Sequence, residues 1–234
     1  MESLLIFAKP PVLGKVKTRL AQERGNVEAV ILYSAFMKDT ARICQMWRRN
    51  KNGSDPNRRL VLCVADQIED PFLTELARIG GAKLMRQAEG DLGDRLAAAF
   101  DQEFSRGARA VCAVGGDSPT MPSHLIELAF RALLWERVVM GPTFDGGYWL
   151  IGANRPAPDI FSNIPWSTPA VTMRTLSKLR QQSIEANLLP FWYDIDSAVD
   201  LEKLAWHLRA IRERDPSIGT ATWNALQRIG IIRE

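Results

Sequence analysis

The chain has 234 residues, of which 46% are hydrophobic and 24% are charged, and its formal net charge at pH 7 is +3. This is the composition of an ordinary folded protein, and it excludes disordered and fibrous chains. The small net charge gives no reason to expect nucleic acid or an anionic membrane as a partner. Because no internal repeat or low-complexity linker interrupts the sequence, we expect residues 1–234 to form a single domain.

The sequence contains no segment typical of a secretion signal or a membrane span. The apolar stretch at residues 4–8 is too short for a signal peptide and follows an acidic residue. No run approaches the ~18 apolar residues that a membrane-spanning helix needs. The three cysteines, Cys44, Cys63 and Cys112, lie far apart in apolar segments, which is typical of buried, reduced thiols. We therefore expect a cytoplasmic protein.

Apolar runs alternate with amphipathic repeats along the first half of the chain. The runs predict strands over residues 3–8, 60–65, 82–87 and 109–119, and the repeats predict helices over residues 26–47, 71–79, 91–107 and 125–133. Such alternation indicates βαβ units and a parallel sheet whose central strands are buried on both faces. We therefore expect an α/β fold, a Rossmann-like three-layer αβα sandwich.

The last third of the chain is less regular. Residues 137–142 and 146–154 predict two strands that could pair with each other, and residues 167–181 predict a helix. Ser197 and Asp200 form a capping-box pattern, which indicates that another helix begins there. The sheet is therefore expected to be mainly parallel but mixed.

Polar loops follow the predicted strands at the edge where ligands bind in open parallel sheets, outside the carboxyl ends of the strands. Asp117 lies at such an end, and so do the loops after Ala8, after Gln87 and before Asp196. An unpaired buried carboxylate is costly, so Asp117 is expected to meet a partner or a cation.

The loop "KPPVLGKVKTRL" places Lys15, Lys17 and Arg19 within five residues, beside Gly14. A glycine turn with several cations suits a polyphosphate. The loop is not a P-loop, because the earlier glycine is absent and Val16 stands where Ser or Thr is required. A solvated basic surface loop is the alternative.

Three further stretches carry candidate site residues, each with a structural alternative. In "QAEGDLGDRL", Asp91 can cap a helix, whereas Gly90 and Gly93 permit close backbone approach. Asp117 in "GGDSP" suits Mg²⁺ or Mn²⁺, although it could simply cap a turn. In "GPTFDGGYWLIG", the glycines after Asp145 suggest either backbone close to a ligand or a tight Asp-Gly hairpin.

Two carboxylates near the last predicted helix are further candidates. Asp194 and Asp196 alternate along an extended segment and so lie on one side of it, and one of them could be a second metal ligand. His124 and His207 both lie in predicted helices without metal-ligand spacing, so a structural role is expected for them.

Taken together, the segments "FAKPPVLGKVKTRLA", "EGDLGDRLAAAF", "GGDSPTMP", "GPTFDGGYWLIG", "IPWST" and "DIDSAVDL" resemble the nucleotide-diphospho-sugar transferase superfamily with the GT-A fold. More narrowly, the chain resembles a bacterial family called radical-SAM/selenodomain-associated transferase 1, or arsenosugar-biosynthesis glycosyltransferase. The resemblance extends nearly end to end. The superfamily also includes guanylyltransferases of cofactor synthesis.

The resemblance implies a metal-dependent transferase that uses a nucleotide-activated donor, with Mg²⁺ or Mn²⁺ on Asp117 and Asp196. The donor would be bound by residues of three segments, namely Ala8, Lys9, Gly14, Lys15, Lys17 and Arg19, then Gln87, Gly93 and Arg95, and then Gly146 and Gly147. Catalysis would rest on Asp117, Lys17 and Asp145, with Asp145, or less readily Asp194, orienting or deprotonating the hydroxyl of a small-molecule acceptor.

Three functions remain open at this point. A glycosyltransferase acting on a nucleotide-diphospho-sugar is favoured by the resemblance. A guanylyltransferase-like nucleotidyltransferase, which releases pyrophosphate, fits the dense basic loop. A non-catalytic nucleotide-binding module is the third possibility.

Overall fold

The computed structural model describes residues 1–50, 53–66, 68–155 and 157–232. The strands are β1 (Glu2–Ala8), β2 (Arg49–Asn50), β3 (Gly53–Ser54), β4 (Arg58–Val64), β5 (Lys83–Arg86), β6 (Ala110–Val114), β7 (Val138–Pro142), β8 (Tyr148–Asn154) and β9 (Ala186–Leu188). The helices are α1 (Thr18–Arg24), α2 (Asn26–Arg48), α3 (Pro71–Gly80), α4 (Leu92–Ser105), α5 (Ser123–Ala132), α6 (Val171–Gln181), α7 (Ala198–Arg212) and α8 (Thr220–Arg228).

Within the described residues, seven strands form one sheet in the order β5-β4-β1-β6-β8-β7-β9. Strands β5, β4, β1 and β6 run parallel to one another, and β9 is parallel to β7. Strand β8 lies between β6 and β7 and is antiparallel to both, so the expected pairing of the two late strands is confirmed. The mainly parallel, mixed α/β sheet predicted from the sequence is also confirmed.

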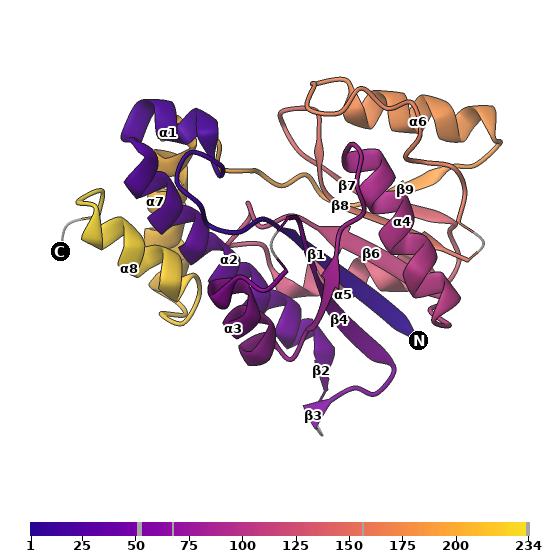
Figure 1. Ribbon diagram of the computed structural model, residues 1–234, viewed down its shortest axis with the longest axis horizontal. Helices are drawn as coiled ribbons and strands as arrows, with labels where there is room; N and C mark the ends of the chain where they lie inside the picture. Colours follow the sequence, from indigo (N-terminus) through magenta and orange to yellow (C-terminus); the bar gives the residue numbers. More distant parts are fainter. Residues whose placement is uncertain (51–52, 67, 156, 233–234) are drawn as a thin grey trace.

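Helices cover both faces of this sheet (Figure 1). One face packs against α2, α3 and α5, with Met37, Leu73 and Ile126 in its core. The other face packs against α4 and α6, through Phe100 and Leu179. The result is the expected three-layer αβα sandwich, because the buried strands are apolar on both faces and need cover on both sides.

A helical group, consisting of α1, α7 and α8, lies beside the sandwich and packs against α2 (Figure 1). Its apolar core includes Leu20, Phe36, Leu204 and Leu226, all fully buried. Helix α2 therefore contributes to two apolar cores, the one against the sheet and the one within the helical group. This arrangement brings the start of α1 and the start of α7 close together, and both flank the candidate site.

Several local predictions are confirmed. Asp91 and Ser197 cap α4 and α7 with complete capping boxes. The three cysteines are buried and free. His124 and His207 lie in α5 and α7.

None of the described helices is long and apolar enough to cross a membrane.

Helices α1 and α8 and strands β2, β3 and β9 were not predicted from the sequence. Helix α1 is only seven residues long and begins among basic residues, and β9 is a three-residue edge strand. Short elements of this kind carry too few apolar positions to show a period.

Candidate functional site

The loop between β1 and α1 is held by Tyr33 of α2. The Lys9 N–H donates a hydrogen bond to the Tyr33 hydroxyl oxygen at 2.9 Å, and the hydroxyl donates to the Lys9 carbonyl at 3.0 Å. Gly14 and Lys17 have positive φ values of 72° and 47°. A left-handed conformation is unfavourable for lysine, and it turns the chain so that Lys17 becomes the N-cap residue of α1.

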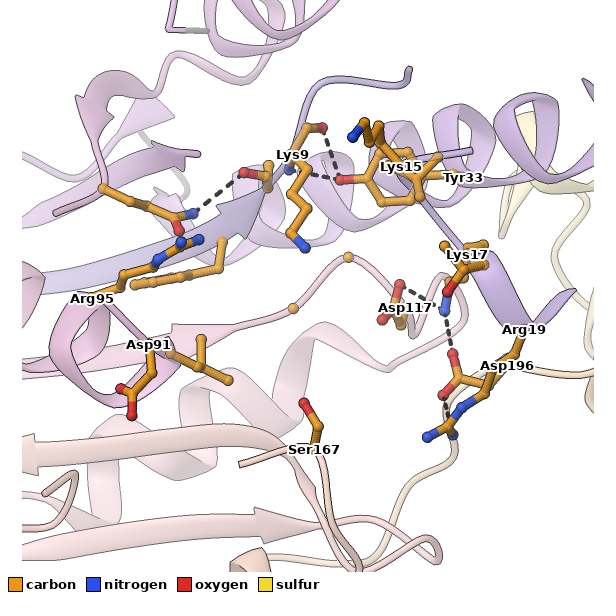
Figure 2. Close-up of a pocket in the computed structure, with 18 of the residues that line it drawn as sticks. Lys9, Lys15, Lys17, Arg19, Tyr33, Asp91, Arg95, Asp117, Ser167 and Asp196 are labelled. Atoms are coloured by element: carbon orange, nitrogen blue, oxygen red, sulfur yellow. Dashed lines mark hydrogen bonds and ion pairs between the residues drawn. The ribbon is translucent and has the colours of Figure 1, made fainter. Parts of the chain in front are cut away.

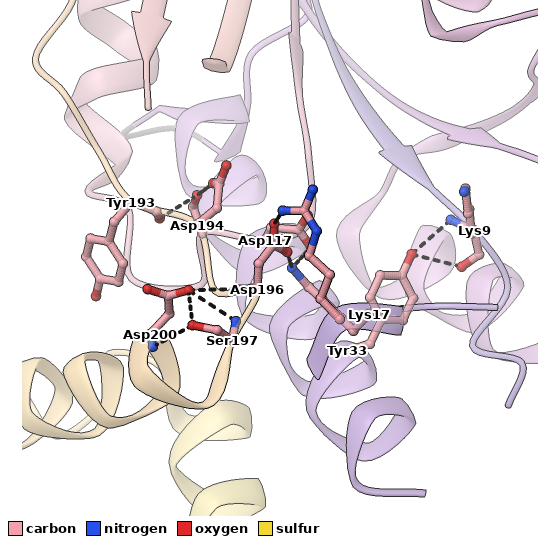
Figure 3. A network of polar contacts seen from close by, with 11 residues as sticks. Lys9, Lys17, Tyr33, Asp117, Tyr193, Asp194, Asp196, Ser197 and Asp200 are labelled. Carbon is pink, nitrogen blue, oxygen red and sulfur yellow. Dashed lines mark hydrogen bonds and ion pairs between the residues drawn. The ribbon is translucent and has the colours of Figure 1, made fainter. Parts of the chain in front are cut away.

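Lys17 joins two carboxylates that come from distant parts of the chain (Figure 3). Its Nζ lies 2.8 Å from Asp117 Oδ1 and 2.9 Å from Asp196 Oδ1. The Lys17 side chain is 4% exposed, whereas those of Asp117 and Asp196 are 41% and 38% exposed. Burial alone would lower the pKa of Lys17, but the charges of the two carboxylates outweigh it and raise that pKa. The ammonium is therefore held charged.

A cavity of about 650 Å³ opens in front of this triad, at the carboxyl ends of β1, β5 and β6. Of the predicted donor-binding residues, Ala8, Lys9, Lys15, Lys17, Arg19, Gln87 and Arg95 line it, together with Asp117 and Asp196. Arg95 and Asp91 lie across the cavity from Lys17 (Figure 2). The cavity therefore combines several cations with three carboxylates, and we call it the basic cavity.

Gln87 lines the basic cavity, whereas Gly93 is not among the described residues that line it, and both make close contacts within the protein. The Gln87 amide donates to the carbonyl of Cys63 at 2.7 Å and to that of Ala8 at 3.3 Å, and so ties together the ends of neighbouring strands. A Cβ on Gly93 would lie 2.5 Å from the Phe161 carbonyl oxygen and 2.6 Å from Trp166 Nε1. The close approach expected at Gly93 is thus to protein, although a role toward a donor stays a prediction.

Asp145, Gly146 and Gly147 form the turn between β7 and β8, as the hairpin alternative expects. Asp145 Oδ1 accepts hydrogen bonds from Thr143 Oγ1 at 2.5 Å and from the Gly147 N–H at 3.1 Å. Gly146 has a φ of 89°, and a Cβ there would overlap the Pro169 carbonyl. Neither these glycines nor Gly14 is among the described residues that line the basic cavity. Asp145 instead lines a second cavity.

The second cavity, of about 1090 Å³, shares Arg19 and Asp196 with the basic cavity, so the two adjoin. We call it the aromatic cavity, because Phe144, Phe191, Trp192, Tyr193 and Trp206 line it. This cavity was not predicted from the sequence, although three consecutive aromatic residues directly before Asp194 were a usable signal.

Asp194 connects the aromatic cavity to the lysine triad. Its Oδ1 accepts a hydrogen bond from Ser118 Oγ at 3.0 Å, and Ser118 directly follows Asp117. Burial raises the pKa of Asp194 to about 7, and the charge of Asp117 acts in the same direction against the opposing effects of Lys17 and Ser118. Ser118 and Tyr33 are thus two positioning residues. Ser118 lies in the GGDSP motif and Tyr33 in the helix predicted over residues 26–47, but the sequence did not reveal their partners.

The carboxylates of Asp117 and Asp196 were expected to hold a divalent cation. Both reach one nitrogen within 2.9 Å, so they are able to face a common cation from two sides. The described residues contain no group of three or more His, Cys, Asp or Glu side chains placed to hold a metal. Two carboxylates are nevertheless enough for Mg²⁺ when substrate phosphates and water complete its shell. The residues therefore fit such an ion when a phosphorylated ligand is bound.

Comparisons with known proteins place this chain in a family. Residues 50–168 match a family model described as "Uncharacterized protein conserved in bacteria (DUF2064)". A crystal structure from Desulfovibrio desulfuricans G20, of a protein proposed to be a nucleotide-diphospho-sugar transferase, is 31% identical, with a TM-score of 0.82 over 97% of this chain and 94% of that one. The chain belongs to the DUF2064 family.

Two more distant structures share the fold. The inositol-1-phosphate CTP transferase of T. maritima is 14% identical, with a TM-score of 0.56. The match covers 90% of this chain and 95% of that chain. Glucosyl-3-phosphoglycerate synthase of Mycobacterium tuberculosis, in complex with Mn²⁺, UDP and glucosyl-3-phosphoglycerate, is 10% identical, with a TM-score of 0.52, 100% of this chain and 81% of that chain being covered. No curated protein sequence matches the chain. The fold is thus of the GT-A and nucleotidyltransferase type.

Proposed function

We propose that this protein is a transferase that takes its donor as a nucleotide-activated compound, in the first place a nucleotide-diphospho-sugar. The observation that carries the proposal is that Lys17 forms ion pairs with Asp117 and Asp196, and that all three side chains line the basic cavity. The assignment of the 31% identical relative supports it. The narrower resemblance to radical-SAM-associated transferases is part of the same proposal.

The donor phosphates would lie in the basic cavity against Lys9, Lys15 and Arg19, since a diphosphate needs several cationic donors together. Gln87 and Arg95, which also line this cavity, would face the nucleoside or the sugar. A divalent cation on Asp117 and Asp196 would neutralise charge on the diphosphate leaving group, as metal ions do in this chemistry. The neighbour that holds Mn²⁺ and UDP supports this arrangement.

The acceptor would enter from the adjoining aromatic cavity. Its hydroxyl oxygen would form a bond to the anomeric carbon while the bond from that carbon to the diphosphate oxygen breaks, and a carboxylate would take the hydroxyl proton. Asp145 was the residue expected in this role from the sequence. The contacts support Asp194 better, because Ser118 holds it beside Asp117, whereas Asp145 Oδ1 already serves the hairpin turn.

Nucleotidyl transfer is a second candidate, in which the acceptor oxygen attacks the α-phosphorus and pyrophosphate leaves. The number of cations in the basic cavity suits a triphosphate, and the fold shared with the CTP transferase of T. maritima supports this alternative. Phosphorus NMR of the products separates the two functions, because glycosyl transfer releases a nucleoside diphosphate and nucleotidyl transfer releases pyrophosphate.

The test of the proposal is donor binding by the Asp117→Asn variant. Calorimetric titration of nucleotides and nucleotide sugars with Mn²⁺ is expected to give saturable binding to the natural protein and at least tenfold weaker binding to the variant. Asp101→Asn is the matched control, since Asp101 is an exposed carboxylate on α4 outside both cavities. Equal affinity of the Asp117 variant would refute the assignment. Nucleotide binding that is equally tight with and without Mn²⁺, with no product from any donor, would instead indicate a non-catalytic nucleotide-binding module.

A further inference from the structure

The aromatic cavity exposes a large apolar surface beside the proposed reaction point. Phe144 is 78% exposed, Phe191 is 55% exposed and Trp206 is 71% exposed. The rings of Phe144 and Phe191 stack with centroids 5.4 Å apart. Exposed apolar patches of this kind mark places where another molecule binds. Since the cavity shares Arg19 and Asp196 with the basic cavity, its occupant lies within reach of the donor.

The charged groups of this cavity are mostly acidic. Its described lining includes the carboxylates of Glu23, Asp145, Asp194, Asp196, Asp200 and Glu202, against the cations Arg19 and Lys203. Both cations already face carboxylates, Arg19 at 3.6 Å from Asp196 and Lys203 at 3.2 Å from Asp200. A phosphate or carboxylate on the occupant would therefore be repelled by these carboxylates. Among the described lining residues, it would meet no lysine or arginine that is not already paired with a carboxylate.

Carboxylates accept hydrogen bonds and do not donate them when ionised. A cavity that combines many acceptors with flat apolar rings is complementary to a ligand that has many hydroxyl donors and an apolar face. A neutral sugar ring or glycoside has both, because its hydroxyls point outward along the ring edge and its C–H groups form the face.

We propose that the aromatic cavity binds the acceptor, and that this acceptor is an uncharged polyhydroxyl ring compound and not a sugar phosphate or an acidic metabolite. The ring stacks on the face of Phe144, Phe191 or Trp206, and its hydroxyls donate to the surrounding carboxylates. That the bound compound is the acceptor of the reaction rests on the proposed function, but its binding to the aromatic cavity does not depend on the donor.

The experiment compares two probes that differ by one phosphate, phenyl β-glucoside and phenyl β-glucoside 6-phosphate. Calorimetry or saturation-transfer NMR on the full chain is expected to show binding of the glucoside and at least tenfold weaker binding of its phosphate. Phe191→Ala and Trp206→Ala are expected to weaken glucoside binding at least fivefold. Trp135→Ala is the matched control, because Trp135 is 88% exposed and lies outside the aromatic cavity.

A charge reversal makes the test independent of any loss of aromatic packing. Glu202→Lys places a cation on an exposed lining position and is expected to raise the affinity for the 6-phosphate while changing that for the glucoside little. Equal or tighter binding of the phosphate by the natural protein would overturn the inference, and so would unchanged glucoside binding in both aromatic variants. Self-association of the natural protein that is lost in Phe191→Ala would assign the patch to a subunit interface instead. Donor binding by the basic cavity is unaffected by any of these failures, so the two proposals fail separately.

Discussion

Replacing Lys17 by methionine removes the cation between Asp117 and Asp196 while keeping most of the buried side-chain volume. Breaking a fully buried ion pair costs about 3–5 kcal/mol, because a charge is left without a partner. Here the remaining charges are the two carboxylates, which are 41% and 38% exposed and are therefore screened by water. We expect the free energy of unfolding to fall by about 1–2 kcal/mol at neutral pH and low salt.

The same variant tests whether a divalent cation uses these carboxylates. In the natural protein, the Lys17 ammonium lies where both carboxylates converge, so a metal ion competes with it. In Lys17→Met this competition is gone, and the dissociation constant for Mn²⁺ is expected to fall about tenfold, equivalent to about 1.4 kcal/mol. Urea denaturation with and without Mn²⁺ measures both effects, because a ligand of the folded state stabilises it by mass action.

Lys15→Met is the control, since Lys15 lies in the same loop but is exposed, and its side chain forms no hydrogen bond or ion pair with the described residues. It is expected to leave the stability of the ligand-free protein within about 0.5 kcal/mol of its original value, as ordinary surface substitutions do. The reasoning is refuted if Lys17→Met is as stable as the natural protein, or if Mn²⁺ stabilises both proteins equally.

Three further perturbations have definite expected outcomes. Gly93→Ala is expected to lower the free energy of unfolding, measured in urea, by about 1–3 kcal/mol, because the new Cβ would lie 2.5 Å from the Phe161 carbonyl oxygen. Gly80→Ala is the control, since its Cβ would come no closer than 4.0 Å to another atom and this substitution is expected not to destabilise the protein. Equal stabilities of the two variants would contradict this account. Tyr33→Phe removes both hydrogen bonds to Lys9, and we expect a loss of about 1–2 kcal/mol together with weaker nucleotide binding in calorimetry; unchanged values of both would argue against an anchoring role. Burial lowers the pKa of His207 from 6.5, so the unfolded chain takes up a proton first and stability is lost as pH falls below 6.5. His207→Gln is expected to flatten this part of the stability curve relative to His124→Gln, and parallel curves for the two variants would show that His207 does not contribute.

Much of the architecture follows from local patterns. The continuous apolar runs at β1, β4 and β6 indicated a parallel sheet because only strands covered on both faces read this way. The capping boxes at Asp91 and Ser197 located two helix starts, since they depend on residues three positions apart.

The placement of β8 between β6 and β7 did not follow from the sequence. Strands β7 and β8 are both apolar on both faces, so either could have lain next to β6. Their order depends on long-range pairing, which no local pattern records.

The candidate site was predictable in its position and not in its contacts. The rule that ligands bind at the carboxyl ends of parallel strands placed the segments of Ala8, Gln87 and Asp117 at one edge. That Lys17 bridges Asp117 and Asp196 depends on a left-handed backbone at Lys17 and on the packing of α1 beside α7. The aromatic cavity was missed because its aromatic side chains come from the β7–β8 turn, the segment before α7 and α7 itself, and only tertiary packing brings them together.

The three residues of the lysine triad are far apart along the chain, the bond from Lys17 to Asp196 spanning 179 residues. A ribosome must therefore synthesise most of the polypeptide before the first of these residues can meet the last. Until then, Lys17 and Asp117 have no second carboxylate to complete their constellation. A nucleotide or a metal ion that recognises the triad would thus act as a reporter of completed folding, and would leave shortened or half-folded chains unbound.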